Sequence, residues 1–218
     1  MSETTLRLDR PLKMVTICLG QMQTNCYIVE NTKTNQAFVF DPGDQGECIM
    51  DTLKEDGMEL AGVCLTHGHF DHIYAVNDLK KSLDVPVYAY ADEAALMGDS
   101  WMNRSKAWAE AMTVTPDILL HDGDELDLAG FHIRVIHTPG HTAGSCCYYF
   151  EEEKILIAGD TLFYESYGRT DLDTGSEAAI MRSLREQLFL LPDDVEVYPG
   201  HGDSTTIGHE KKYNPAAF

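Results

Sequence analysis

The sequence Thr-His-Gly-His-Phe-Asp-His at residues 66–72 stands at the end of the apolar segment 60–66 and contains three imidazoles and one carboxylate. Residues two apart in an extended segment project to the same side, so His67 and His69 can reach one metal ion. Asp71 and His72 begin a helical pattern, which directs them to a second position beside the first. We therefore expect a strand that ends at this cluster and a helix that starts from it.

Another interpretation of residues 66–72 is an exposed loop in which Asp71 caps the next helix. One capping carboxylate would not account for three histidines. Imidazole and carboxylate ligands without thiolate suit zinc, iron or manganese. The cluster therefore favours a metal site, and the ligand types leave the choice among these metals open.

Three further candidate ligands, His141, Asp160 and His201, each follow a predicted strand through a glycine-containing turn. In α/β architectures, side chains from several strands converge beyond the strand ends, and ligand sites form there. A lone histidine after a turn is more often a surface or core residue, but the cluster at 66–72 favours a ligand role for all three. The remaining histidines lack this context, and we expect structural roles for them: His121, His132, His137 and His209.

The hydrophobic pattern alternates between strands and helices along the whole chain. It predicts strands at 15–19, 26–29, 37–40, 60–66, 85–90, 131–136, 146–150, 155–158 and 195–198, and helices at 47–56, 71–83, 177–190 and near His209. Two predicted hairpins look alike, and each ends near an aspartate, at Asp41 and at Asp160, which hints at internal duplication. In segment 91–116, we favour packing over pocket lining as the role of Trp101, Met102, Trp108 and Met112.

The charge balance restricts the partners. The chain has 16 Lys and Arg against 36 Asp and Glu, a formal net charge of −20, which disfavours nucleic acid as the main partner. It also argues against a phosphodiesterase that would use the same metals. For a small anionic substrate, bound cations would have to supply positive charge at the site.

The sequence also indicates where the chain works. No apolar run approaches the roughly 20 residues of a membrane span, so we expect no membrane association. Residues 1–13 lack the apolar core of a secretory signal. The six cysteines form no Cys-x-x-Cys pair, so we expect free thiols in a reducing cytoplasm.

Four motifs in this order and spacing resemble those of metallo-β-lactamase-fold hydrolases: THGHFDH at 66–72, GHTAGS at 140–145, GDTLF at 159–163 and PGHG at 199–202. Two further motifs resemble the short bacterial glyoxalase II (hydroxyacylglutathione hydrolase) group: GRTD at 168–171 and GHE…NP at 208–215. The resemblance implies an α/β fold, a four-layer α/β/β/α sandwich, formed by residues 1–218 as one domain. Full-length glyoxalase II carries a C-terminal helical domain that helps to hold glutathione. We expect no separate domain of this kind here, so the thiol carrier of the substrate is not specified.

Carried over residue by residue, the resemblance assigns seven metal ligands to two divalent metal ions, with zinc expected before iron or manganese. His67, His69 and His141 would hold the first ion. Asp71, His72 and His201 would hold the second, and Asp160 would bridge the two. Tyr167 and Arg169 could bind an anionic substrate, although Arg169 could equally pair with Asp171 in a structural turn.

We predict hydrolysis of a small-molecule thioester by a metal-bridging hydroxide, with Asp71 as the catalytic residue that orients this water or accepts its proton. A thiolate, with a parent pKa of about 8.5, leaves without help from a general acid. One alternative is a persulfide dioxygenase with a single iron held by His67, His141 and Asp160. Another is a non-catalytic metal-binding protein. The sequence does not specify the oligomeric state.

Overall fold

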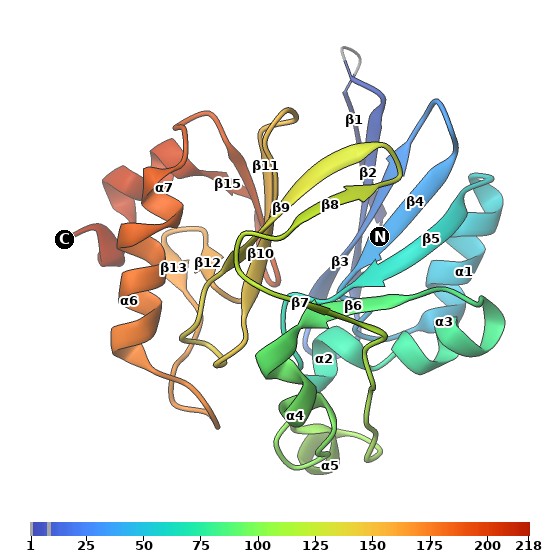
Figure 1. The fold of residues 1–218 in the computed structure, drawn as a ribbon, viewed down its shortest axis with the longest axis horizontal. Coiled ribbons are helices and arrows are strands. Elements are labelled where there is room, and N and C mark those ends of the chain that lie inside the picture. The colour runs from blue at the N-terminus through green and yellow to red at the C-terminus, as the bar shows by residue number, and fades with distance from the viewer. Residues whose placement is uncertain (1, 8–9) are drawn as a thin grey trace.

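The computed structural model describes residues 2–7 and 10–218. Two β-sheets lie face to face, and helices cover the outer face of each (Figure 1). The first sheet has the strands in chain order: β1 (Ser2–Arg7), β2 (Leu12–Leu19), β3 (Thr24–Asn31), β4 (Gln36–Phe40), β5 (Glu59–Cys64), β6 (Val87–Tyr90) and β7 (Ile118–Leu120). The strands from β1 to β4 pair antiparallel, and those from β4 to β7 pair parallel.

The second sheet has the order β15-β14-β11-β10-β9-β8. Its strands are β8 (Glu125–Leu128), β9 (Phe131–His137), β10 (Cys146–Phe150), β11 (Ile155–Gly159), β14 (Glu196–Pro199) and β15 (Thr205–Thr206), and a small separate hairpin joins β12 (Leu162–Phe163) to β13 (Ser166–Tyr167). In both sheets an antiparallel hairpin is followed by a parallel strand: β3–β4 by β5, and β10–β11 by β14. This shared order of pairings agrees with the internal duplication suggested by the sequence.

The α-helices are α1 (Gly46–Glu55), α2 (Phe70–Ile73), α3 (Val76–Ser82), α4 (Ala94–Met97), α5 (Ser105–Trp108), α6 (Glu177–Glu186) and α7 (Ile207–Tyr213), with 3-10 turns η1 (Ala91–Glu93), η2 (Leu188–Leu190) and η3 (Pro215–Ala217). In Figure 1, α1 and α3 lie outside the first sheet, and α6 and α7 lie outside the second. In the described residues, no helix combines the length and apolar character needed to cross a bilayer.

Three apolar layers hold the fold together. Between the sheets, the Phe40 ring packs edge-on against Tyr148 at 5.2 Å and against Phe150 at 6.1 Å. A second layer joins the first sheet to α1 and α3, and a third joins the second sheet to α6 and α7. Three buried interfaces require four layers, so the predicted α/β/β/α sandwich is confirmed.

The single helix predicted over 71–83 is wrong in one respect, because the structure has two helices there. The amide of Ala75 donates to the carbonyl of Pro42 at 2.9 Å instead of to Asp71. Gly43 approaches the freed carbonyl of Asp71 so closely that a Cβ at Gly43 would lie 1.6 Å from that oxygen. The loop after β4 therefore interrupts the helix and fixes the short turn that carries Asp71 and His72.

The predicted helix over 177–190 also ends early, and α6 stops at Glu186. Gln187 has non-helical backbone angles, φ −128° and ψ −68°, and its side-chain amide donates to the carbonyl of His137 at 2.7 Å. The short strands β7, β8, β12, β13 and β15 were not predicted. Each has two to four residues, too few for a hydrophobic period to be recognised.

Candidate metal centre

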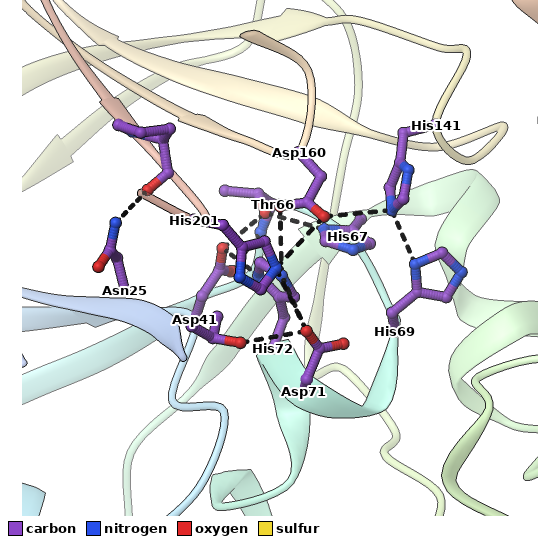
Figure 2. Close-up of polar contacts among 12 residues, drawn as sticks. Asn25, Asp41, Thr66, His67, His69, Asp71, His72, His141, Asp160 and His201 are labelled. Atoms are coloured by element: carbon purple, nitrogen blue, oxygen red, sulfur yellow. Dashed lines mark hydrogen bonds and ion pairs between the residues drawn. The ribbon is translucent and has the colours of Figure 1, made fainter. Parts of the chain in front are cut away.

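Four loops bring the predicted metal ligands together, and each loop follows a strand. The loop after β5 carries His67 and His69 and leads directly into α2, which carries Asp71 and His72. The other three loops follow β9, β11 and β14 in the second sheet, and they supply His141, Asp160 and His201. Figure 2 shows these side chains pointing toward a common centre from separate segments.

The seven side chains form two groups. Ligand atoms of His67, His69 and His141 all lie within 4.8 Å of one another, and so do those of Asp71, His72 and His201. In the first group, His69 Nδ1 and His141 Nε2 are 2.8 Å apart. Each group offers three ligand atoms to one position, as the sequence predicts for two ions.

Asp160 lies between the two groups. Its Oδ2 is 3.5 Å from His141 Nε2 in the first group and 3.5 Å from His201 Nε2 in the second. Its Oδ1 is 3.4 Å from His72 Nε2. One carboxylate therefore reaches both groups, which is the geometry required of a bridging ligand.

The hydrogen bonding of the buried atoms supports metal binding. Four buried atoms of the cluster have no hydrogen-bond partner: His67 Nε2, His69 Nε2, His72 Nε2 and Asp160 Oδ1. Buried polar atoms in proteins are nearly always partnered, so four unpartnered atoms in one cluster need an explanation. Two divalent cations would supply partners for His67 Nε2, His72 Nε2 and Asp160 Oδ1, and imidazole and carboxylate are suitable ligands for zinc, iron or manganese.

Asp41 orients His72 from behind, a role that the sequence interpretation missed. Asp41 Oδ2 accepts a hydrogen bond from His72 Nδ1 at 2.9 Å and another from the Thr66 hydroxyl at 2.6 Å. A carboxylate partner at Nδ1 leaves Nε2 of the same ring free to bind metal. Asp41 directly follows β4, next to parallel β5, so its position after a strand was the available signal.

Other residues hold the ligands in place. The Thr24 hydroxyl donates to Asp71 Oδ2 at 3.1 Å, and His141 Nδ1 is 2.8 Å from the carbonyl oxygen of Arg169. Two threonines are next to ligands in the sequence, Thr66 beside His67 and Thr142 beside His141. Thr66 Oγ1 lies 3.2 Å from His67 Nδ1, whereas Thr142 bonds to Ser145 instead.

The pKa values divide the imidazoles into two kinds. Burial and neighbouring imidazoles lower the pKa of His67, and burial lowers that of His69 to about 3. Burial also opposes protonation of His72 and His201, but nearby carboxylates outweigh it and raise the pKa of His72 well above its usual value and that of His201 to about 9. His67 and His69 are therefore neutral, the form in which imidazole binds metal.

The two carboxylates among the candidate ligands, Asp71 and Asp160, have lowered pKa values. Burial alone would raise the pKa of Asp160, but His72, His201 and His141 hold it well below its usual value. The pKa of Asp71 is also lowered against the effect of burial, by His72 and His201. Both carboxylates are therefore ionised and suited to bind cations.

The carboxylate of Glu93 connects two of the loops that carry ligands. Its side chain is 1% exposed, and its two oxygens accept hydrogen bonds from the amides of Gly68 at 2.7 Å and Gly144 at 2.8 Å. Gly68 stands between His67 and His69, and Gly144 stands in the loop of His141. Glu93 therefore acts as a positioning residue for the first group.

We expect Glu93→Gln to weaken metal binding without unfolding the chain. An amide has one acceptor oxygen, so one of the two loop amides would face an NH2 group. Loss of such a support typically lowers metal affinity by roughly 10- to 100-fold. Competition against a chelator measures this change. Glu186→Gln, an exposed change on α6, should leave the affinity unaltered, and equal affinities in the two variants would contradict this role of Glu93.

Gly200 makes room for the ligands. A Cβ at this position would lie 2.2 Å from Asp160 Oδ1 and 2.7 Å from His72 Cε1. We therefore expect Gly200→Ala to displace both ligands and to reduce the bound metal measured by elemental analysis. At Gly202, φ is +75° and a Cβ would meet nothing within 4 Å. Gly202→Ala should thus lose about 1 kcal/mol of stability but keep its metal, and metal loss from it alone would refute the steric explanation.

A cavity of about 640 Å³ opens over the ligands. The ligands that line it are His69, Asp71, His141, Asp160 and His201, and the other lining residues are Met22, Phe70, Arg104, Trp108, Phe163, Arg169 and Leu172. The packing interpretation is wrong for Trp108, which is 71% exposed and forms part of the cavity wall. Met112 does pack, against the layer between the first sheet and its helices.

Of the two predicted substrate-binding residues, one lines the cavity and the other does not. Arg169 lines the cavity, and it also pairs with Asp171 through two hydrogen bonds of 2.7 and 2.9 Å. Tyr167 lies in β13, donates from its hydroxyl to Glu177 at 3.0 Å and is absent from the described cavity lining. A role for either residue in substrate binding stays a prediction.

The four histidines expected to be structural lie outside both groups of ligands. The His137 ring stacks on Tyr90 at 4.1 Å, and His209 Nε2 lies 3.0 Å from a carboxylate oxygen of Glu165. His132 lies 3.1 Å from Asp127, and His121 lies 3.8 Å from Asp124.

The model of the metallo-β-lactamase superfamily matches residues 19–201 of the chain, a range that contains all seven candidate ligands. The chain belongs to the metallo-β-lactamase superfamily. It is a metal-dependent hydrolase of this superfamily, with His and Asp clusters suited to two metal ions. The identity of the metal is not fixed by the family.

Two curated relatives are similar over most of their length. The probable metallo-hydrolase YqgX of Bacillus subtilis is 35% identical, covering 90% of this chain and 93% of YqgX. The hydroxyacylglutathione hydrolase GloC of Haemophilus influenzae is 33% identical, covering 88% of this chain and 92% of GloC.

Two crystal structures share the fold closely. The BLEG-1 B3 metallo-beta-lactamase is 38% identical with a TM-score of 0.87, covering 92% of this chain and 97% of its own. TTHA1623 in a di-iron-bound form is 35% identical with a TM-score of 0.83, covering 92% of this chain and 98% of its own.

Proposed function

We propose that this protein hydrolyses a small-molecule thioester, in a reaction of the hydroxyacylglutathione hydrolase type. The observation that carries the proposal is the pair of ligand groups that share Asp160 at the base of an open cavity. The likeness to GloC supports the same reaction type. Zinc is the first expectation for both ions, and the di-iron form of TTHA1623 keeps iron as an alternative.

Two bound ions would lower the pKa of water from 15.7 toward about 7 and polarise the substrate carbonyl. The protein's part is to hold the reacting groups. Asp71 lines the cavity, accepts a hydrogen bond from Thr24 and lies 3.3 Å from His201 Nε2. His72 and His201 lower the pKa of Asp71 against the effect of burial, so its carboxylate is ionised and can orient the attacking water by accepting a hydrogen bond.

The cavity wall favours a leaving group that needs no proton. Among the described lining residues outside the ligand groups, none is a hydroxyl, ammonium or carboxylic acid side chain that could serve as a general acid. A thiolate leaves without protonation, whereas an amide nitrogen must be protonated. This wall supports a thioester over an amide as the substrate.

Two other reactions can be weighed on the same geometry. A persulfide dioxygenase would use only His67, His141 and Asp160, and it would leave the group formed by Asp71, His72 and His201 without a role. The name of the BLEG-1 relative raises β-lactam hydrolysis, which would require protonation of the leaving nitrogen. The complete second group and the lack of an additional acid both favour thioester hydrolysis.

A substrate panel tests the proposal. Metal-loaded protein should hydrolyse S-lactoylglutathione or simple acetyl thioesters at least a hundredfold faster than a chromogenic cephalosporin, and it should consume no oxygen with glutathione persulfide. Faster cephalosporin cleavage, or oxygen uptake with the persulfide, would overturn the proposal. His69→Ala should abolish the thioesterase activity, which excludes a contaminating enzyme.

A further inference from the structure

We propose that Arg104 and Arg169 form an anion-binding wall of the cavity, and that Arg104 selects substrates carrying a carboxylate. This inference rests on the proposed function only in taking the cavity as the substrate site. The carboxylate could belong to the acyl arm or to the thiol arm of the substrate. Its chemistry is the same in both cases, so the test below separates the two arms.

The proposed wall contains positively charged side chains, whereas the molecule as a whole is strongly negative. The chain has a formal net charge of −20, with 36 acidic residues against 16 basic ones. Apart from the candidate metal ligands, the charged residues that line the cavity are Arg104 and Arg169. The two arginines therefore place positively charged groups at the cavity of a protein that is acidic as a whole.

Arg104 lines the cavity and pairs with one residue that is distant in sequence. It immediately precedes α5, and its side chain is 30% exposed. Its Nη2 lies 3.0 Å from Asp173 Oδ2, and its Nε is buried without a hydrogen-bond partner. A guanidinium has five N–H donors, so one ion pair at Nη2 leaves donors for a carboxylate.

Arg169 connects the same wall to the metal ligands. The Nε and Nη2 of Arg169 donate to the carboxylate of Asp171. The backbone carbonyl oxygen of Arg169 is the partner of His141 Nδ1. Nη1 of Arg169 is not used by this pair. A carboxylate bound between the two guanidiniums would therefore lie at a fixed position relative to His141.

A second cavity beside the first has acidic instead of basic residues in its lining. This cavity of about 270 Å³ shares Met22, Phe70, Asp71 and Trp108 with the first. Its described lining contains Asp44 and Glu110 but no Lys or Arg. A substrate that spans both cavities should therefore carry its anionic group at the arginine wall and an uncharged arm at the other end.

The structural alternative is that the four charges only fasten two loops. The pair of Arg104 with Asp173 could join α5 to the segment after β13, and the pair of Arg169 with Asp171 could stabilise a turn within that segment, without either arginine contacting a substrate. Exposed ion pairs contribute little to stability, so this connection between the two segments would be weak. The two interpretations differ for Asp173→Asn, which breaks the Arg104 pair but keeps the guanidinium.

Binding of non-hydrolysable ketones, in which a methylene replaces the thioester sulfur, tests the wall without requiring turnover. The ketones carry a carboxylate on the acyl arm, a carboxylate on the thiol arm, or the matching carboxamides. Calorimetry with the metal-loaded protein gives Kd for each compound. The preference is the Kd of a carboxamide divided by the Kd of its matching carboxylate.

We expect a preference for at least one arm, and Arg104→Gln should reduce it by roughly three- to tenfold, the effect of one charged hydrogen bond in a partly exposed site. Asp173→Asn should keep the preference. Arg182→Gln, which removes the same charge from the exposed face of α6, should keep it as well.

Several results would overturn the inference. One is the absence of a carboxylate preference in the unaltered protein. Another is a preference that survives Arg104→Gln, because the carboxylate would then bind the metals directly. A third is an equal loss of the carboxylate preference in Asp173→Asn, which would show that the preference depends on the ion pair and not on the guanidinium of Arg104 itself. Failure of the thioester panel would refute the proposed reaction and leave these binding results to be judged separately.

Discussion

Replacement of Asp160 by asparagine should remove metal binding and hydrolysis together. Among the residues that the structure describes, Asp160 is the one carboxylate within 3.5 Å of imidazoles from both ligand groups, at His72, His141 and His201. Asparagine keeps the size but loses the negative charge and one acceptor oxygen. We expect kcat/KM for a thioester to fall by on the order of a thousandfold or more, because electrostatic stabilisation of the transition state depends on the bound cations.

Elemental analysis and thioesterase kinetics on the same sample measure this effect, and circular dichroism confirms that the variant is folded. Asp51→Asn is the matched control, since Asp51 lies exposed on α1, away from the ligands. It should retain both metal and activity. Asp160→Asn protein with full metal content and full activity would show that the bridging assignment is wrong.

Removal of the metals should also destabilise the protein substantially. Ions that bind only the folded chain stabilise it by about 4 kcal/mol when present at 1,000 times their Kd. For a chain of this size, each kcal/mol shifts Tm by roughly 2–4 °C, so we expect chelation to lower Tm by roughly 10 °C. Without the ions, buried atoms such as His67 Nε2 and His72 Nε2 have no partner, which adds to the loss.

Thermal unfolding with and without a strong chelator measures the shift, and added metal should reverse it. Asp160→Asn protein should show little response to the chelator, because it holds little metal. A Tm that is unchanged by complete removal of metal would mean that the cluster is stable on its own, and it would contradict the account of its unpartnered atoms.

The candidate metal ligands could be selected from the sequence because each has a local signal. His67 and His69 directly follow the apolar strand β5, and Asp160 and His201 follow β11 and β14 through glycines. A strand end beside a glycine is visible in one sequence without knowledge of the fold. The four-layer arrangement came from the resemblance of the motifs, and the three apolar layers confirm it.

The supporting residues could not be predicted, because their partners are remote in sequence. Glu93 bonds to amides 25 and 51 residues away, and Asp41 bonds to His72, 31 residues away. The break between α2 and α3 depends on the carbonyl of Pro42, which approaches only in the folded chain. The ion pair between Arg104 and Asp173 likewise joins two segments that are remote in sequence.

Anomalous X-ray diffraction from crystals of protein purified without added metal tests the central claim most directly. The account predicts two strong peaks at the absorption edge of the bound metal. One should lie among His67, His69 and His141, the other should lie among Asp71, His72 and His201, and Asp160 should contact both. A single peak, or peaks away from these side chains in protein that hydrolyses thioesters, would contradict it.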